Sequence, residues 1–94
     1  MPYIAGDLVR VSVSFETGGI ATDPTTVVLR YKNPAGTPTT WTFGVDSQVV
    51  KNSVGNYRAD INANVGGTWY FRWEGTGAAQ GVAQDSFVVT ATNI

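Results

Sequence analysis

Hydrophobic and polar residues alternate along most of the chain with a period of two. In residues 8–15 the apolar side chains fall on one face, and arginine and serine fall on the other. Such alternation is typical of a β-strand with one face in a hydrophobic core and one in water. The pattern predicts further strands at 26–32, 39–43, 56–62, 68–74 and 85–92, with a weaker one near 48–51. The predicted inward residues include Val9, Val11, Val13, Phe15, Val27, Leu29, Tyr31, Trp41, Phe43, Tyr57, Ala59, Ile61, Phe87, Val89 and Ala91.

Turn-forming residues separate these runs. In "NPAG", Pro34 and Gly36 hold the positions that a type I turn with a following glycine favours. Other glycine-containing turns are predicted at 17–19, 53–56 and 65–67. About seven short strands, spaced by turns at roughly 8–12 residues, are typical of a β-sandwich. No linker, repeat or low-complexity tract divides the chain. We therefore predict one all-β domain, 1–94, with about seven antiparallel strands and with 1–6 as a candidate N-terminal arm.

The stretch "GTWYFRWEGTG" carries the densest group of aromatic residues. In a strand, Trp69, Phe71 and Trp73 project to one side, and Tyr70 and Arg72 project to the other. A small domain gains stability by burying such large rings, so we expect this stripe in the core. The alternative is a solvent-facing platform on which sugar rings stack, because such a platform has the same spacing.

The composition excludes several classes of chemistry. The 94 residues include neither cysteine nor histidine, which rules out disulfides, thiol nucleophiles and Ser-His-Asp sites. The formal net charge is −1 and the six cations are scattered singly, so nucleic-acid binding is not expected. Neither a signal peptide nor the roughly 20 apolar residues of a membrane span is present. The sequence predicts a soluble protein that is made in the cytoplasm.

The acidic residues do not form a recognisable site. "DINANVG" begins like a calcium loop, but the sixth position is Val65 and the twelfth is Phe71, where glycine and a carboxylate are required. The carboxylates that would have to form a hydrolase pair are those of Asp46, Asp60, Glu74 and Asp85. Asp60 and Glu74 both fall on predicted outward faces, which favours solvated surface charges over catalysis. We predict no enzyme activity, no cofactor and no metal.

Two segments are candidate partner contacts. Tyr3 and Ile4 form a short apolar arm that either docks on a neighbour or packs against the end of the domain's own sheet. The segment "GTGAAQG", residues 75–81, is predicted to be a flexible loop, because it holds no side chain that would pin it. Its candidate contact residues are Gly75, Thr76, Gly77, Ala78, Ala79 and Gln80.

The order of the motifs resembles a known group of proteins. The motifs are Gly6-Asp7, Asp23-Pro24, Pro34 with Gly36, Gly55 with Tyr57, Gly67 with Trp69, Tyr70 and Trp73, and Phe87 with Val89. From about residue 6 to 90 the chain resembles the small immunoglobulin-like proteins encoded in the structural gene clusters of tailed bacteriophages and prophages. "TWYFRWEGTG" is the most specific part. No catalytic residue transfers, because the matched positions determine the fold.

The resemblance implies an immunoglobulin-like β-sandwich that is a non-catalytic structural protein of the virion, made in the host cytoplasm. Its expected partners are phage capsid, neck or tail proteins, with self-association in the particle. Capsid decoration or a head–tail accessory role is the favoured location, and a tail or baseplate subunit is the alternative. A different class is a carbohydrate-binding module in which Tyr70 or Trp41 stacks on sugar rings. The sequence is also compatible with a third class, a cytoplasmic scaffold protein.

Overall fold

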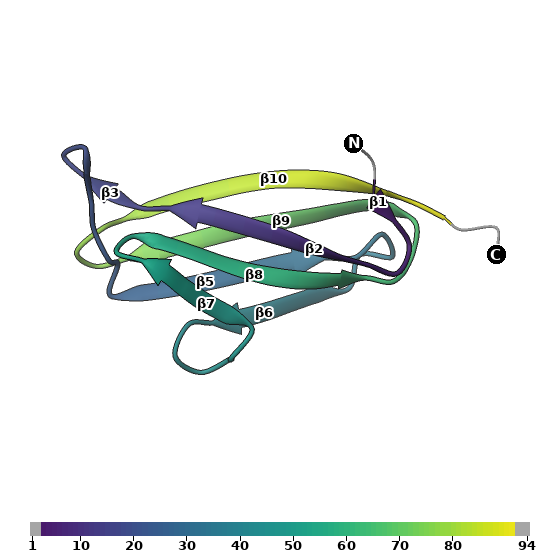
Figure 1. The fold of residues 1–94 in the computed structure, drawn as a ribbon, viewed down its shortest axis with the longest axis horizontal. Coiled ribbons are helices and arrows are strands. Elements are labelled where there is room, and N and C mark those ends of the chain that lie inside the picture. The colour runs from purple at the N-terminus through teal and green to yellow at the C-terminus, as the bar shows by residue number, and fades with distance from the viewer. Residues whose placement is uncertain (1–2, 92–94) are drawn as a thin grey trace.

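A computed structural model of the chain describes residues 3–91, and these form strands, turns and loops without any helix (Figure 1). The ten strands are β1 (Tyr3–Ile4), β2 (Asp7–Ser14), β3 (Glu16–Thr17), β4 (Ile20–Ala21), β5 (Thr26–Lys32), β6 (Pro38–Thr42), β7 (Val49–Ser53), β8 (Asn56–Ala63), β9 (Gly67–Thr76) and β10 (Gly81–Thr90). Seven of them have five residues or more, and each of these seven overlaps a predicted strand, although β10 begins four residues earlier than predicted. The described residues contain no helix that is long and apolar enough to cross a membrane.

Two sheets pack face to face. One has the strand order β1-β10-β9-β5-β6, the other has the order β2-β8-β7, and β3 and β4 form a separate short hairpin. Figure 1 shows β2, β8 and β7 as a layer in front of the larger sheet. The pairings are antiparallel except that of β1 with β10, which is parallel. The Cα positions extend over 47 × 25 × 19 Å, so the molecule is elongated along its strands.

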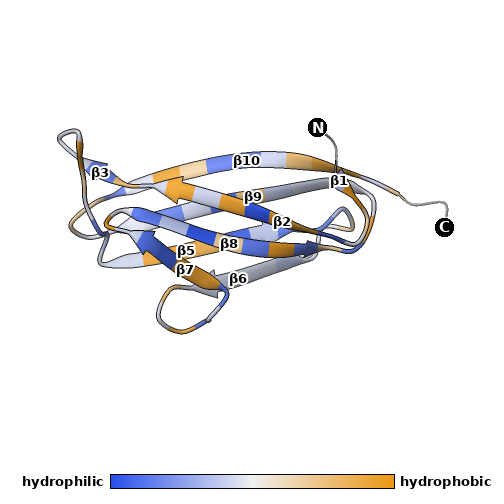
Figure 2. Cartoon of the chain, viewed as in Figure 1, coloured by the Kyte–Doolittle hydropathy of each residue, from blue (hydrophilic) through white to orange (hydrophobic). Residues whose placement is uncertain are grey.

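The alternating pattern of the sequence forms the core. Val9, Val11 and Val13 of β2 are buried while their neighbours in the strand are exposed. Figure 2 shows the same alternation of apolar and polar positions along β2 and β8. Residues of both sheets join one hydrophobic cluster, which also includes Leu29, Val49, Tyr57, Ala59, Ile61 and Val89. Alternation therefore identifies the inward face of each strand because only one face of each sheet is covered.

The aromatic stripe of β9 lies in the core, as predicted. Trp69 is 3% exposed and Trp73 is fully buried, while Phe71 is half-buried against the same cluster. The indole N–H of Trp69 donates to the carbonyl of Val65 at 3.1 Å. That of Trp73 is buried and has no acceptor within residues 3–91. The sugar-platform interpretation of this stripe is wrong, because the smaller sheet covers it.

Several predicted inward positions lie at the margins of the core. Phe43 follows the end of β6 and is 39% exposed, although its ring contacts the Tyr57 ring at a centroid distance of 5.2 Å. Trp41 is half-buried, and Ala91 is exposed beyond the end of β10. The ends of these strands extend beyond the opposite sheet, so their inward-facing side chains remain partly exposed to solvent. Residue 92, the last of the predicted final strand, lies outside the described residues.

The predicted flexible loop at 75–81 is shorter and better fixed than expected. β9 continues through Gly75 and Thr76, and β10 begins at Gly81, so only residues 77–80 connect the two strands. Ala79 is 2% exposed and belongs to the core cluster. Thr17 Oγ1 donates to the Ala78 carbonyl at 3.1 Å. The prediction that no side chain pins this segment is wrong, because small residues let its backbone approach neighbouring elements closely.

Candidate interaction surface

Tyr3 and Ile4 are docked on the domain's own sheet. They pair with Val89 and Thr90 at the end of β10, and the Tyr3 ring meets Phe87 edge-on at 5.7 Å between centroids. Both keep exposed surface, 36% for Tyr3 and 56% for Ile4. Residues 1–2 of the predicted arm lie outside the described residues. The alternative of packing against the domain's own sheet end accounts for the described part of the arm.

The two predicted contact segments lie far apart. β10 runs from Gly81, next to the 77–80 connection, to Thr90, which pairs with β1 (Figure 1). Ten strand residues span about 30 Å, since each advances the chain by about 3.3 Å. Of the predicted loop residues, Thr76, Gly77, Ala78 and Gln80 are exposed, and Gly75 and Ala79 are buried. The arm and the loop can therefore serve contacts at the two ends of the molecule, and not one joint site.

A third surface lies apart from both predicted contact segments. The outer face of the five-stranded sheet carries an open groove of about 610 Å³ across β6, β5, β9 and β10. We call it the basic groove, and its outward-facing side chains are those of Pro38, Thr40, Arg30, Lys32, Tyr70, Arg72 and Gln84. The register places the side chains in rows across the strands, with Arg72 of β9 between Arg30 of β5 and Gln84 of β10. Lys32 lies opposite Tyr70 in the next row.

One carboxylate holds the two arginines of the basic groove. Glu74 Oε1 lies 3.1 Å from Arg30 Nε, and its Oε2 lies 2.9 Å from Arg72 Nε. Arg72 also donates to Gln84 Oε1 at 3.4 Å. Lys32 makes no ion pair with any residue in the range 3–91. Three cations and one carboxylate leave a local charge of +2 on a chain whose formal net charge is −1.

The two candidate sugar-binding aromatics lie on opposite faces of this sheet. Tyr70 is 58% exposed and lines the basic groove. Trp41 pairs with Leu29 on the inner face, where its ring packs against Tyr31 at 5.0 Å between centroids. They cannot stack on one ligand together, and Tyr70 is the one that an external ring can reach. The period of two in the sequence had already placed Trp41 among the inward residues and Tyr70 on the face opposite to Trp69 and Trp73.

The four acidic residues considered for a hydrolase pair are all at least partly exposed, and cations accompany two of them, Asp60 and Glu74. Asp60 accepts from Arg10 at 2.8 Å, and this hydrogen bond lowers the pKa of the Asp60 carboxyl. Glu74 is held by the two arginines described above, and Asp85 is exposed on β10. Within residues 3–91 no group of three or more acidic residues is placed to hold a metal ion.

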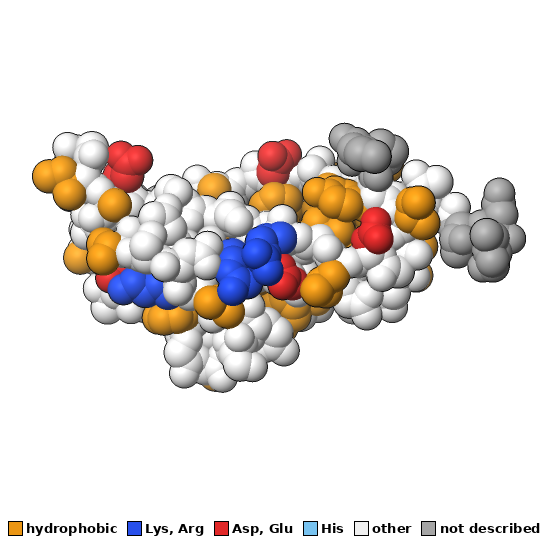
Figure 3. All heavy atoms as spheres, viewed as in Figure 1, with side chains coloured by type: hydrophobic (Ala, Val, Ile, Leu, Met, Phe, Trp, Pro, Cys, Tyr) orange, Lys and Arg blue, Asp and Glu red, His pale blue; other side chains and the backbone are white. Residues whose placement is uncertain are grey.

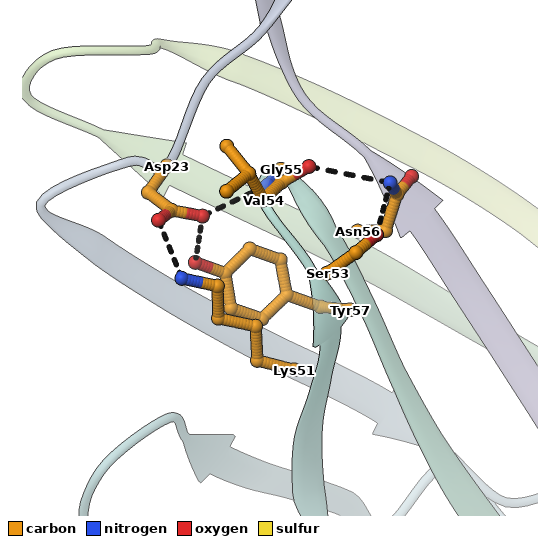
Figure 4. A network of polar contacts seen from close by, with 7 residues as sticks. All are labelled: Asp23, Lys51, Ser53, Val54, Gly55, Asn56 and Tyr57. Atoms are coloured by element: carbon orange, nitrogen blue, oxygen red, sulfur yellow. Dashed lines mark hydrogen bonds and ion pairs between the residues drawn. The ribbon is translucent and has the colours of Figure 1, made fainter.

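A polar network that the sequence did not predict joins the two sheets (Figure 4). Asp23, just before β5, accepts from the Gly55 amide at 2.8 Å, from the Tyr57 hydroxyl at 3.0 Å and from the Lys51 ammonium. The hydrogen bond from Lys51 and then that from Gly55 lower the pKa of Asp23. Burial, followed by the hydrogen bond to Asp23, raises the pKa of Tyr57 to about 12. This carboxylate ties the entry of β5 to the β7–β8 hairpin.

The signal for this network was present in two separate motifs. Asp23-Pro24 and Gly55 with Tyr57 were both singled out, but as a strand entry and a turn. Glycine is required at position 55, where φ is +78° and an added Cβ would lie 2.6 Å from the Phe15 carbonyl oxygen.

Comparison with known proteins found no matching family model, no matching curated protein and no matching solved structure.

Proposed function

We propose that this chain is an immunoglobulin-like β-sandwich that serves as a non-catalytic structural protein in the virion of a tailed phage or a gene-transfer particle. The sequence resemblance supplies the virion context. The observation that supports the fold most directly is the order of strands in the two sheets. The protein is made in the host cytoplasm and joins the particle by surface recognition.

The order of the strands in the two sheets corresponds to that of strands B to G in the immunoglobulin scheme. In that scheme strands G, F and C form one sheet, strand C′ extends it in variable-type domains, and strands B, E and D form the other. Here β10, β9, β5 and β6 match G, F, C and C′, and β2, β8 and β7 match B, E and D. β1 then takes a first-strand position beside G. The two buried tryptophans, Trp69 and Trp73, lie on β9, the counterpart of F, whereas the buried tryptophan of antibody domains lies on strand C, and the inter-sheet disulfide of those domains has no counterpart in a chain without cysteine.

The shape of the domain supports recognition through surfaces. A rigid sandwich presents the 77–80 connection at one end, β1 at the other, and the basic groove along the outer face of its larger sheet. Contacts to a repeated site on a particle gain strength from multiplicity, even where each is weak. Its partners are capsid, neck or tail proteins and neighbouring copies of itself. Capsid decoration or a head–tail accessory role is the preferred location, followed by tail or baseplate.

Quantitative mass spectrometry of purified particles from the source tests this proposal. A ratio near one copy per major capsid subunit, or a simple fraction of it, assigns the chain to the shell. A handful of copies per particle assigns it to the neck, tail or baseplate. Absence from purified particles overturns the virion proposal.

A carbohydrate-binding module is the second candidate, and the exposure of Tyr70 within the basic groove favours it. The ring stands on an outer sheet face beside hydrogen-bonding side chains, as sugar stacking requires. Binding of the parent chain to a glycan array, lost in a folded Tyr70→Ala variant, supports this function. A parent chain that binds no glycan removes it.

A further inference from the structure

The basic groove places like charges directly opposite each other, whereas the smaller sheet pairs an arginine with a carboxylate. On the smaller sheet, Arg10 of β2 lies directly opposite Asp60 of β8, and the two form an ion pair at 2.8 Å. Figure 3 shows positive and negative side chains meeting in the middle of that face. On the larger sheet, Arg30 of β5 lies directly opposite Arg72 of β9. Like charges at directly opposed positions destabilise a sheet.

Glu74 offsets this arrangement only in part. Its two oxygens are divided between the two guanidinium groups, so each arginine receives one carboxylate oxygen. Their side chains remain 60% and 45% exposed, which leaves further N–H donors free for a ligand. Lys32 adds a third cation that no described residue neutralises. Cations that face one another across a groove, bridged by a single carboxylate and still exposed, have the features of a binding site.

We propose that the basic groove binds a carboxylate-bearing surface of a protein partner. Each guanidinium can accept a carboxylate in a fork geometry, and the Lys32 ammonium acts as a point charge beside it. Tyr70 supplies a flat contact in the same row. This inference adds the chemistry of the partner to the proposed function. It rests on that function for the identification of the partner as a protein.

The groove is better suited to a few separate carboxylates than to a polyanion of high charge density. Three cations around one groove match two or three carboxylates, whereas tracking a phosphate backbone needs a longer continuous positive surface. The remaining residues carry three positive and six negative charges, so they add no net positive charge along which a long polyanion could continue beyond the groove. A neutral glycan would not require paired arginines. A protein surface with a few acidic side chains meets all of these conditions.

The test measures binding of poly-L-glutamate to the purified chain at low ionic strength, by isothermal titration calorimetry. We expect Lys32→Gln and Arg72→Gln each to weaken binding about fivefold, in keeping with the loss of one exposed ion pair. Glu74→Gln removes the competing carboxylate, so it should strengthen binding about fivefold although it loosens the sheet. Raising the salt concentration should weaken binding by the parent chain.

The matched control is Arg58→Gln. It removes one positive charge from the outer face of the smaller sheet and should leave binding unchanged. Equal losses in Arg58→Gln and Arg72→Gln would overturn the inference, and so would a Glu74→Gln variant that binds no better than the parent. Lys32→Gln disturbs no internal ion pair, so its result stands even if an arginine variant unfolds. Stronger binding to heparin than to poly-L-glutamate, with the same dependence on the variants, would replace the carboxylate partner by a sulfated glycan.

A second arm separates the inference from the proposed function. Particles assembled with Lys32→Gln/Arg72→Gln should contain several-fold fewer copies of the chain than particles assembled with Arg58→Gln. Equal incorporation of both variants would overturn the inference that the groove contacts the particle, and it would leave the virion function intact. Absence of the parent chain from particles, with poly-L-glutamate binding that follows the groove variants, would overturn the virion function and leave the groove chemistry intact.

Discussion

At the scale of single residues, Asp23 has an effect larger than its surface position suggests. Its carboxylate receives three donors from the β7–β8 side of the molecule while its own backbone leads into β5 of the other sheet (Figure 4). The Tyr57 ring below it is 2% exposed, so the hydroxyl depends on Asp23 for its acceptor. Loss of the carboxylate would leave a buried polar group without a partner, which costs free energy of folding.

This network predicts a defined dependence of stability on pH. The pKa of Asp23 is lowered in the folded state, so its contribution is present above its usual value of 3.8 and is lost as the pH falls through the lower folded value. The pKa of Tyr57 is raised from 10.0 to about 12, so its contribution is present below pH 10 and is lost as the pH rises toward 12. Thermal melts of the parent, Asp23→Asn and Tyr57→Phe across both windows measure these effects.

Tyr57→Phe should lower the free energy of unfolding by about 1 kcal/mol near neutral pH, since one hydrogen bond is lost. The difference between parent and Tyr57→Phe should shrink between pH 10 and 12, because only the parent loses the contribution of this hydroxyl. A difference that stays constant across that range would contradict the assignment.

The two buried tryptophans of β9 should respond differently to the same substitution. Trp69→Phe removes an indole N–H that donates to the Val65 carbonyl, whereas Trp73→Phe removes one that has no acceptor within residues 3–91. We expect Trp69→Phe to lower the free energy of unfolding by about 1 kcal/mol more than Trp73→Phe. Chemical denaturation of the two variants measures the difference. A larger loss of unfolding free energy for Trp73→Phe would mean that the change in side-chain volume, and not the indole hydrogen bond, determines the loss.

At the scale of elements, the connection between β9 and β10 is fixed by close backbone approach. Gly77 has a φ of +94°, and a Cβ at this position would overlap the side chain of Thr25. Ala78 receives a hydrogen bond from Thr17 of β3. The connection therefore packs against two other elements, and its small residues serve packing as well as turning.

Two glycine substitutions separate these roles. Gly36 also has a positive φ, of +88°, but an added Cβ there meets nothing within 4 Å. Gly36→Ala should lower the free energy of unfolding by about 1 kcal/mol, from backbone strain alone. Gly77→Ala should lower it by about 3 kcal/mol, because steric overlap adds to the strain. Denaturant melts of both variants test this, and equal losses would show that the 77–80 connection moves aside freely.

At the scale of the whole molecule, one hydrophobic cluster joins both sheets, so neither sheet has a core of its own. Small single domains with one core usually unfold in a single cooperative step. We expect tryptophan fluorescence, which reports β6 and β9 of the larger sheet, to change together with far-UV circular dichroism, which reports all strands. Separate midpoints for the two signals would show that the sheets unfold independently.

Charge is distributed unevenly over the molecule. A chain with a net charge of −1 has a local charge of +2 on the outer face of its larger sheet. The molecule thus carries an excess of positive charge on this face, although the chain as a whole has a net negative charge. For a domain that assembles with others, this asymmetry favours one orientation over its reverse.

The seven longer strands and most of their inward faces could be predicted from the sequence, whereas the two-residue strands β1, β3 and β4 could not. Residues such as Val9, Val11 and Trp73 could be assigned to the core because a sheet with one covered face imposes a period of two on its own side chains. Turn positions such as Pro34 with Gly36 followed from local backbone preferences. Both signals act between residues that are close in the chain.

Only the tertiary structure decided which strands are neighbours. The juxtaposition of Arg30 and Arg72, the docking of Ala79 and the contacts of Asp23 all join segments distant in the chain. The alternating pattern fixes the face of each strand, but it leaves strand order and much of the register open, because any apolar face can pack on any other. Strand pairing and burial are settled by the packing of the whole core, and the basic groove exists only once that packing is complete.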